Sequence, residues 1–393
     1  MPPAATTAPR TQPVYLQGIE VPAEAINPPL FFQLTRRKQT QEKAFVFAGL
    51  GMTDVVELRK SDVLAEIRIR MTGSVVVTLN AGTAATTARW PYDLLRVCKF
   101  TANGAANLIN AGGLQLKARE ILGREAASDR GVSQSVAGAT VNQGTLASAS
   151  EAWGLGSQAT GVAGGTYNFE LTWIVPVADD QVDLAGAIFL ATTSTDLTLS
   201  LQWATSADLF TLTGAATAVV SGTCQVITKK YSIPVVNGQI VVPELNLFHS
   251  FVSFRVGNGI ATGVNEVRLP GQGVGKSLLR ALFQVYNNGV PLQMNAANFG
   301  DLYWRYGNNE TPDDYPDGRA LREELEHLYN SDVGGVWGFG CMEFSAENGF
   351  RDAVDEGTTS DLRLGITVPA AVVLTNPAVE GVAETIWLAG QAA

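Results

Sequence analysis

The stretch from Thr166 to Trp203 limits the possible folds of this chain more than any other stretch does. Its first part alternates apolar and polar residues, which is the period-2 pattern of a strand buried on one face. The apolar residues of this first strand are Tyr167, Phe169, Leu171, Trp173 and Val175. We expect Pro176 to end it, and a second alternating run predicts a second strand. The apolar residues of the second strand are Leu197, Leu199, Leu201 and Trp203.

A short helix is expected between these two strands. Asp179, Asp180 and Asp183 stand where acidic residues cap a helix start and interact favourably with its dipole. An apolar run long enough for two helical turns follows, with Leu184, Ala187, Ile188 and Leu190. The order strand, short helix, strand is therefore predicted.

The same order recurs in the second half of the chain. Asp317 is placed as the N-cap of a helix, and Gly334-Gly335 is expected to stop it. The helix would carry one apolar face formed by Leu321, Leu325 and Leu328. The apolar run from Val336 to Phe344 then predicts a strand. Two copies of one pattern predict two related domains.

The order WIVPVADDQVDLAGAIF followed by LTLSLQW resembles the double jelly-roll major capsid proteins of tectivirus-type bacteriophages, which are tailless, icosahedral and contain an internal membrane. Weaker similarity extends from about Ala44 to about Leu388. The resemblance implies an all-β fold of two tandem jelly-roll β-sandwich domains, a double jelly roll with short helices inserted between strands. We expect an N-terminal arm at residues 1–43, a first jelly roll at 44–235 and a second at 236–393.

Length and composition agree with this fold class. The 393 residues have room for two domains, and the 40 glycines with only 16% charged residues favour short strands joined by turns over helical bundles. Cys98, Cys224 and Cys341 are far apart in apolar contexts, so we expect buried thiols in a chain folded in a reducing cytosol. We find no apolar run of the roughly 18 residues that a membrane span needs, and no secretory signal.

The charge of the chain is unevenly distributed. The net charge is −10, which argues against direct nucleic-acid binding because phosphate contact needs a basic face. Residues 1–43 carry five basic and three acidic side chains, whereas residues 301–361 carry four basic and fifteen acidic ones. We expect part of the acidic region to face solvent on the capsomer exterior.

The arm is rich in proline but too apolar for a free tail. Our hypothesis is that it docks on another subunit or on a membrane face. The residues assigned to this docking are Phe31, Phe32, Arg36, Arg37 and Lys38. The alternative is an arm that packs on its own domain.

The secondary structure of several other segments is predicted by their pattern, whereas that of others stays open. Val63 to Met71 alternates as a strand buried on one face, and Ser74 to Leu79 follows as another. Tyr92 to Lys99 fits a strand or a helical turn, and the amphipathic segment Leu114 to Leu122 is left unassigned. Residues 131–165 form a nearly uncharged loop that we expect to be ordered by neighbours in a shell or to project outward.

Motifs of enzymes are weak in this chain. Gly271 to Ser277 looks like a phosphate-binding loop, but Pro270 stands where the motif needs glycine, so a glycine hairpin is favoured. Two histidines, His249 and His327, are too few for a zinc cluster or a histidine-based triad, and we expect His249 to be a packed side chain. The carboxylates of Asp313, Asp314 and Asp317 could bind calcium, although a charged turn fits better.

We therefore expect no catalytic, cofactor-binding or metal-binding residues and no cofactor. The resemblance implies a major capsid protein that assembles as pseudo-hexagonal homotrimers into the icosahedral shell of a membrane-containing double-stranded DNA phage. Its expected partners are further copies of itself in the trimer and in neighbouring capsomers, vertex or minor capsid proteins and the internal viral membrane, without direct nucleic-acid contact. The protein would be made in the host bacterial cytoplasm and reside in the virion.

The alternative from another class is a secreted carbohydrate-binding or glycoside-cleaving β-sandwich protein. It predicts a signal peptide and an exposed aromatic platform.

Overall fold

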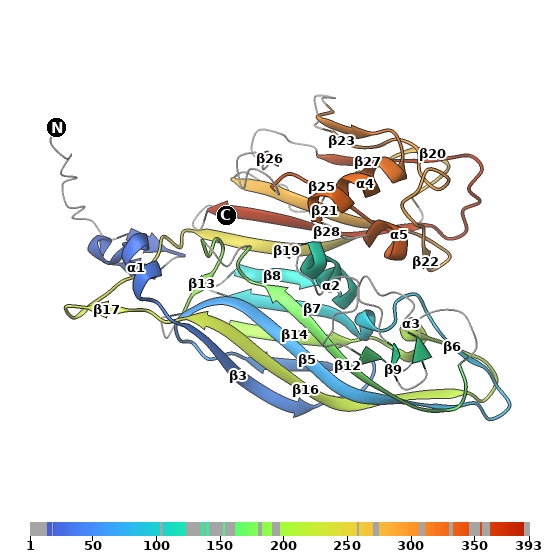
Figure 1. Ribbon diagram of the computed structural model, residues 1–393, viewed down its shortest axis with the longest axis horizontal. Helices are drawn as coiled ribbons and strands as arrows, with labels where there is room; N and C mark the ends of the chain where they lie inside the picture. Colours follow the sequence, from blue (N-terminus) through green and yellow to red (C-terminus); the bar gives the residue numbers. More distant parts are fainter. Residues whose placement is uncertain are drawn as a thin grey trace.

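The computed structural model arranges the chain as two β-sandwiches, with the first half of the chain in one and the second half in the other (Figure 1). It describes residues 14–17, 19–102, 105–122, 135–136, 139–140, 152–153, 162–179, 183–190, 197–257, 259–269, 275–305, 311–329, 333–345, 354–355 and 362–388. None of the helices among these residues is long and apolar enough to cross a membrane.

One sheet of the first sandwich is built from long antiparallel strands in the order β11-β12-β5-β16-β3, with β13 beside β5. The bounds are β3 (Arg37–Val46), β5 (Val63–Thr78), β11 (Ala152–Trp153), β12 (Gly165–Pro176), β13 (Ile188–Phe189) and β16 (Thr217–Tyr231). The pairing of β12 with β5 is unbroken from Gly165 opposite Val77 to Pro176 opposite Glu66. Both predicted strands between Val63 and Leu79 thus belong to the single strand β5.

A ten-stranded sheet runs through both halves in the order β22-β21-β28-β19-β8-β7-β14-β4, with β25 and β26 beside β21. From the first half come β4 (Thr53–Glu57), β7 (Leu95–Ala102), β8 (Ala105–Ala111) and β14 (Leu197–Trp203). From the second half come β19 (Leu247–Gly257), β21 (Lys276–Asn287), β22 (Val290–Pro291), β25 (Phe339–Glu343), β26 (Val354–Asp355) and β28 (Ala378–Leu388). The halves meet where β8 and β19 pair in parallel.

A four-stranded sheet in the order β20-β27-β23-β24 lies in the second half. Its strands are β20 (Gly263–Arg268), β23 (Leu302–Arg305), β24 (Asp313–Tyr315) and β27 (Arg363–Val368). Four small sheets pair β1 (Val14–Leu16) with β2 (Ile19–Val21), β6 (Ala84–Thr86) with β15 (Phe210–Leu212), β9 (Ser135–Val136) with β10 (Ala139–Thr140), and β17 (Val235–Val236) with β18 (Gln239–Ile240).

The helices are short and stand between strands. They are η1 (Ala23–Ala25), α1 (Pro28–Leu34), η2 (Tyr92–Leu94), α2 (Gly113–Leu122), α3 (Ser206–Leu209), α4 (Gly318–Tyr329) and α5 (Val333–Trp337). The open assignment at Tyr92 to Lys99 resolves into η2 followed by β7, and the unassigned segment Leu114 to Leu122 lies in α2.

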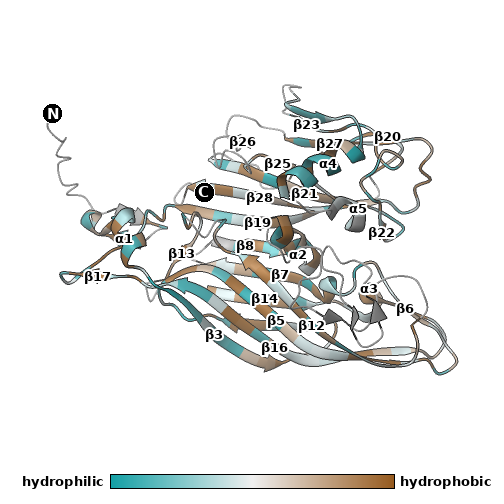
Figure 2. Ribbon diagram, in the orientation of Figure 1, coloured by the Kyte–Doolittle hydropathy of each residue, from teal (hydrophilic) through white to brown (hydrophobic). Residues whose placement is uncertain are grey.

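The hydrophobic core confirms the strand pattern from which the sequence analysis started. Along β12 and β14 the predicted apolar residues are buried, except that Tyr167 is only partly so, and alternating bands of hydropathy are visible along β5 and β16 (Figure 2). Trp173 and Trp203 lie 6.4 Å apart between ring centroids. The Trp173 Nε1–H also donates a 3.0 Å hydrogen bond to the carbonyl of Tyr92, so the buried indole is satisfied.

The prediction of a helix between β12 and β14 is wrong. Among the described residues, the Asp179 N–H donates a 2.9 Å hydrogen bond to the Ala185 carbonyl, and the chain then enters the short strand β13. Leu184 and Gly186 have φ of 60° and 80°, which an α-helix cannot contain. The apolar side chains from Leu184 to Leu190 are mostly buried in tertiary contacts, so they show no helical stripe with a solvated opposite face.

The helix predicted in the second half is confirmed as α4. The Asp317 Oδ1 accepts hydrogen bonds from the N–H groups of Arg319 and Ala320, and Leu321 and Leu325 are buried. The predicted stop is wrong, because α4 ends at Tyr329 and both glycines lie inside α5. The Gly334 carbonyl accepts hydrogen bonds from the N–H groups of Met294 and Gly338, so contacts distant in sequence stabilise this extra turn.

Two loop predictions fall mainly outside the described residues. Most of residues 131–165 and residues 270–274 of the phosphate-loop lookalike lie there. The described end of that lookalike, Lys276 and Ser277, forms the start of β21.

The three cysteines are free and buried as predicted. Burial, together with the nearby Asp54 carboxylate, raises the pKa of Cys224 to about 12, which keeps this side chain a thiol.

Gly113→Ala should destabilise the fold, because an added Cβ would lie 2.1 Å from the Tyr92 carbonyl oxygen and 2.5 Å from Trp173 Nε1. We expect a loss of about 1–3 kcal/mol in the free energy of unfolding, measured by urea denaturation. Gly257→Ala is the control, since nothing lies within 4 Å of its added Cβ. Equal stability of the two variants would contradict this packing of α2 against β12.

Candidate functional site

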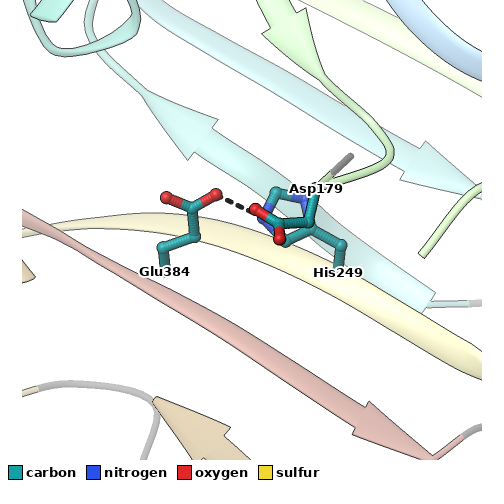
Figure 3. A group of neighbouring side chains, drawn as sticks. All are labelled: Asp179, His249 and Glu384. Atoms are coloured by element: carbon teal, nitrogen blue, oxygen red, sulfur yellow. Dashed lines mark hydrogen bonds and ion pairs between the residues drawn. The ribbon is translucent and has the colours of Figure 1, made fainter. Parts of the chain in front are cut away.

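Buried charged side chains gather where the two halves meet. We call this group the junction cluster, and it consists of Arg119, Asp179, His249, Arg280, Glu343 and Glu384. The residues come from α2, the segment after β12, β19, β21, β25 and β28, so the cluster connects both halves. Figure 3 shows three of its members, with Asp179 and His249 on one side of Glu384.

Glu384 is the centre of the junction cluster because the buried strand β28 carries it into the interior. Its side chain has no solvent exposure. The Arg119 Nη2 lies 2.9 Å from its Oε1, His249 Nε2 lies 2.7 Å from the same oxygen, and Arg280 Nη1 lies 3.2 Å from Oε2. Burial alone would raise the pKa of Glu384, but the two arginines outweigh burial and hold that pKa well below its usual value.

Arg280 extends the junction cluster along β21 into the second half. Its Nε lies 2.8 Å from Glu343 Oε2, and its Nη2 donates a 3.1 Å hydrogen bond to the Ser345 hydroxyl. The Tyr329 hydroxyl also donates to Glu343. Burial alone would lower the pKa of Arg280, but Glu384 and Glu343 raise it well above its usual value. The guanidinium therefore stays charged.

Arg119 and His249 tie the loop after β12 to the second half. The Arg119 Nη2 donates to Asp179 Oδ1 at 2.8 Å as well as to Glu384. His249 Nδ1 lies 2.9 Å from the Pro176 carbonyl oxygen. The prediction that His249 is a packed side chain is confirmed, since its side chain is fully buried.

The side chains of Asp179, His249 and Glu384 are candidate metal ligands, because one ligand atom from each lies within 4.8 Å of the others. Arg119 Nη2 contacts both carboxylates at 2.8 and 2.9 Å, so its guanidinium stands where a cation would bind. Arg280 adds a second positive charge next to Glu384. This arrangement leaves no open position between the carboxylates of Asp179 and Glu384, so a metal ion would have to displace the Arg119 guanidinium.

A second group of ion pairs lies nearby. The Arg89 Nη2 contacts both carboxylate oxygens of Glu380 at 2.8 Å, and its Nη1 contacts Asp93 Oδ2 at 2.8 Å. Arg89 precedes η2 in the first half, and Glu380 lies on β28 in the second. Arg96 and Arg255 line the adjoining cavity of about 240 Å³.

The sequence analysis did not find these partners. The available signal was the presence of Arg280, Glu380 and Glu384 inside otherwise apolar strands, where a charge requires a partner.

The docking residues predicted in the arm lie at one end of the first sandwich, but not together on one surface. Phe31 is fully buried in a small hydrophobic cluster with Val63 and Val242, whereas Phe32 is 42% exposed. In α1 the Asn27 Oδ1 caps the helix.

The basic docking residues are exposed. Arg36 lies between α1 and the edge strand β3, Arg37 is the first residue of β3, and Lys38 Nζ lies 3.4 Å from Asp62. Residues 37–43 of the expected arm thus belong to a sheet, as in the alternative of an arm packed on its own domain. Docking on a subunit or membrane stays a prediction.

The acidic loop before α4 uses two of its carboxylates internally. Asp313 accepts a 2.6 Å hydrogen bond from Trp304 Nε1, and Asp317 caps α4. These roles agree with the charged turn favoured over a calcium site.

Glu384→Gln should destabilise the protein strongly, because Arg119 and Arg280 would lose their shared buried counter-charge. We expect a loss of about 3–5 kcal/mol in the free energy of unfolding at pH 7, measured by chemical denaturation. Glu323→Gln, which removes an exposed ion pair with Arg319, is the control and should change it by less than about 1 kcal/mol. A loss no larger than that of the control would show that Glu384 does not stabilise the junction.

Several solved structures with the same fold are viral capsid proteins. The major capsid protein of Sulfolobus turreted icosahedral virus is 13% identical, with a TM-score of 0.62 over 90% of this chain and 97% of that chain. The major capsid protein P2 from bacteriophage PM2 is 11% identical, with a TM-score of 0.52 over 91% and 99%. A PBCV-1 virus capsid protein is 12% identical, with a TM-score of 0.54 over 91% and 95%. The likeness shows a double jelly-roll fold.

Sequence comparison adds the family. No curated protein matches the chain. The family model described as P3 major capsid protein N-terminal matches residues 5–234, which is more than half of the chain. The chain therefore belongs to the P3 major capsid protein family.

Proposed function

We propose that this chain is the major capsid protein of a tailless icosahedral phage of tectivirus type, and that it forms pseudo-hexagonal homotrimers around an internal membrane and double-stranded DNA. The observation that carries the proposal is the family match over residues 5–234 in a chain that folds as two jelly rolls. As a capsid protein it resides in the virion. The tectivirus type and the trimer are supported by the resemblance stated above.

The fold suits a building block of a shell. Three chains with two similar sandwiches each supply six similar units, which suit a hexagonal lattice, and heterologous contacts between trimers can extend that lattice into a closed shell. The ten-stranded sheet and the junction cluster join the two sandwiches of one chain. Because the two sandwiches are joined in this way, one chain can make contacts on several sides in a lattice while its two halves keep one orientation.

We also propose that the chain acts by assembly rather than by catalysis. The buried carboxylate of Glu384 is held by Arg119 and Arg280, which keep its pKa well below the usual value, so it is a poor proton donor or acceptor. The six tryptophans whose side chains the structure describes are all buried, which argues against the aromatic platform of the carbohydrate-binding alternative. They are Trp90, Trp173, Trp203, Trp304, Trp337 and Trp387.

The proposed partners are further copies of the chain, vertex or minor capsid proteins, and the internal membrane. We assign the membrane or subunit contact to the end that carries α1. The exposed apolar residues at this end are Phe32, Leu34, Val235 and Ile240. Arg36 and Arg37 lie beside them in the chain and can attract anionic headgroups. The domain boundaries 1–43, 44–235 and 236–393 belong to this proposal.

The purified protein should have the native mass of a trimer. Three chains of 41.6 kDa give about 125 kDa, and we expect this mass by native mass spectrometry to persist on dilution. Electron microscopy of the same sample should show a pseudo-sixfold outline. A monodisperse monomer at all concentrations would contradict the proposed capsomer.

Replacing Phe32 and Leu34 together by serine should weaken docking of this end, because both side chains are about two-fifths exposed and add little to the core. We expect at least a tenfold loss in binding to vesicles that contain phosphatidylserine, with the native mass unchanged. Val264→Ser is the control, since Val264 is exposed on β20 in the other half. Unchanged vesicle binding and unchanged particle assembly would contradict the docking hypothesis, whereas a loss of assembly alone would assign the docking to a subunit.

A further inference from the structure

His249 lies between two hydrogen-bond acceptors. Its Nδ1 is 2.9 Å from the carbonyl oxygen of Pro176, and its Nε2 is 2.7 Å from the carboxylate oxygen Oε1 of Glu384. A carbonyl oxygen carries no proton, so Nδ1 must be the donor of the first bond. A neutral imidazole has one N–H, so its Nε2 lone pair would then face the carboxylate.

We infer that His249 is held as an imidazolium inside the folded chain, and that this buried proton is one of the bonds that lock the two jelly rolls together. With both ring nitrogens protonated, His249 donates to Pro176 at the end of β12 and to Glu384 on β28. These residues belong to the first and second halves of the chain. The proton therefore contributes directly to the junction.

The charge of the junction cluster supports the same protonation state independently. Arg119 and Arg280 supply two positive charges. The three carboxylates of Asp179, Glu343 and Glu384 supply three negative charges. A neutral His249 would leave this buried cluster with a net charge of −1, whereas an imidazolium brings the cluster to zero. An unbalanced charge in a low-dielectric interior is costly, so the neutral cluster is favoured.

A protonated Glu384 could also satisfy a neutral imidazole, since its hydroxyl would donate to Nε2. The two arginines oppose this arrangement. Arg119 donates to Glu384 Oε1 through Nε and Nη2 at 3.1 and 2.9 Å, and Arg280 Nη1 lies 3.2 Å from Oε2. Both oxygens of the group thus face guanidinium, which requires a carboxylate.

Each described element that packs against His249 was considered for the charged groups that it carries. Arg119 lies on α2 beside the buried pair Lys117 and Glu120, whose atoms are 3.1 Å apart and cancel each other. Asp179 follows β12. Arg280, Glu343 and Glu384 lie on β21, β25 and β28, and Tyr329 on α4 donates to Glu343 without carrying charge.

The His249 ring is closed off from solvent. The backbone at Gly186 packs on the His249 backbone, so closely that an added Cβ would lie 2.3 Å from His249 Cβ. The His249 side chain has no solvent exposure. Solvent therefore does not replace the hydrogen bond to Glu384 when Nε2 loses its proton.

The consequence is a junction that weakens as the pH rises. In the unfolded chain an exposed histidine has an ordinary pKa of about 6.5 and releases its proton above that pH. The folded chain keeps the proton, so the folded state binds more protons than the unfolded state, and stability falls with increasing pH. The unfolding equilibrium constant should rise by up to about tenfold for each pH unit above 7, until the folded chain also loses the proton.

The first test reads the proton directly in the unaltered protein. The chain contains two histidines, so labelling with ¹⁵N-histidine gives two ring systems in NMR spectra. At pH 7.5 we expect both ring nitrogens of His249 to show the chemical shifts of protonated nitrogens. An unprotonated ring nitrogen in His249 at this pH would overturn the inference.

The second test measures the pH dependence of stability. We expect urea unfolding of the wild type to become easier from pH 6.5 to 8. His249→Gln, which can donate a hydrogen bond but cannot hold the charge, should lose this dependence, and the control His327→Gln should keep it. An equal slope in the wild type and His249→Gln would overturn the inference. If His249→Gln does not fold, the NMR test on the wild type decides alone.

Discussion

The burial of Glu384 is the constraint on which the junction of the two sandwiches depends. A carboxylate without solvent contact requires compensating charge, and here Arg119 of the first half and Arg280 of the second supply it. The same carboxylate lies 2.7 Å from Nε2 of His249 on β19. Because the partners come from both halves, one buried group sets where α2, β19, β21 and β28 lie relative to one another.

The junction differs in kind from the interior of each sandwich. Inside the first sandwich, Trp173 and Trp203 pack in an apolar core, whose stabilisation is non-directional and scales with the buried area. At the junction, ion pairs of 2.7 to 3.2 Å depend strongly on geometry. The parallel pairing of β8 with β19 adds backbone hydrogen bonds across the same boundary. The hydrophobic cores thus supply most of the stability, while the polar junction specifies one orientation of the two halves, as a lattice of repeated contacts requires.

The fold was predictable from the sequence where a local period decides it, and unpredictable where distant contacts do. The strands β5 and β12 alternate every second residue, and α4 has an N-cap with leucines at helical spacing, so each could be read from its own residues. Most residues from Leu184 to Leu190 are apolar and buried by distant contacts on several sides, and this apolar run imitates a helix in the sequence. The junction cluster joins residues from Arg119 to Glu384, whose proximity no local pattern encodes.

The edge strand of the first sandwich shows how a capsid protein can avoid pairing with the strands of other chains. Strand β3 lies at the end of its sheet, with β16 on one side. An open edge of ten residues could pair with any other strand. Arg37, Lys38 and Lys43 are exposed along β3 and oppose such pairing through desolvation and repulsion. A protein that assembles in many copies needs this restraint, because only contacts of defined geometry lead to a closed shell.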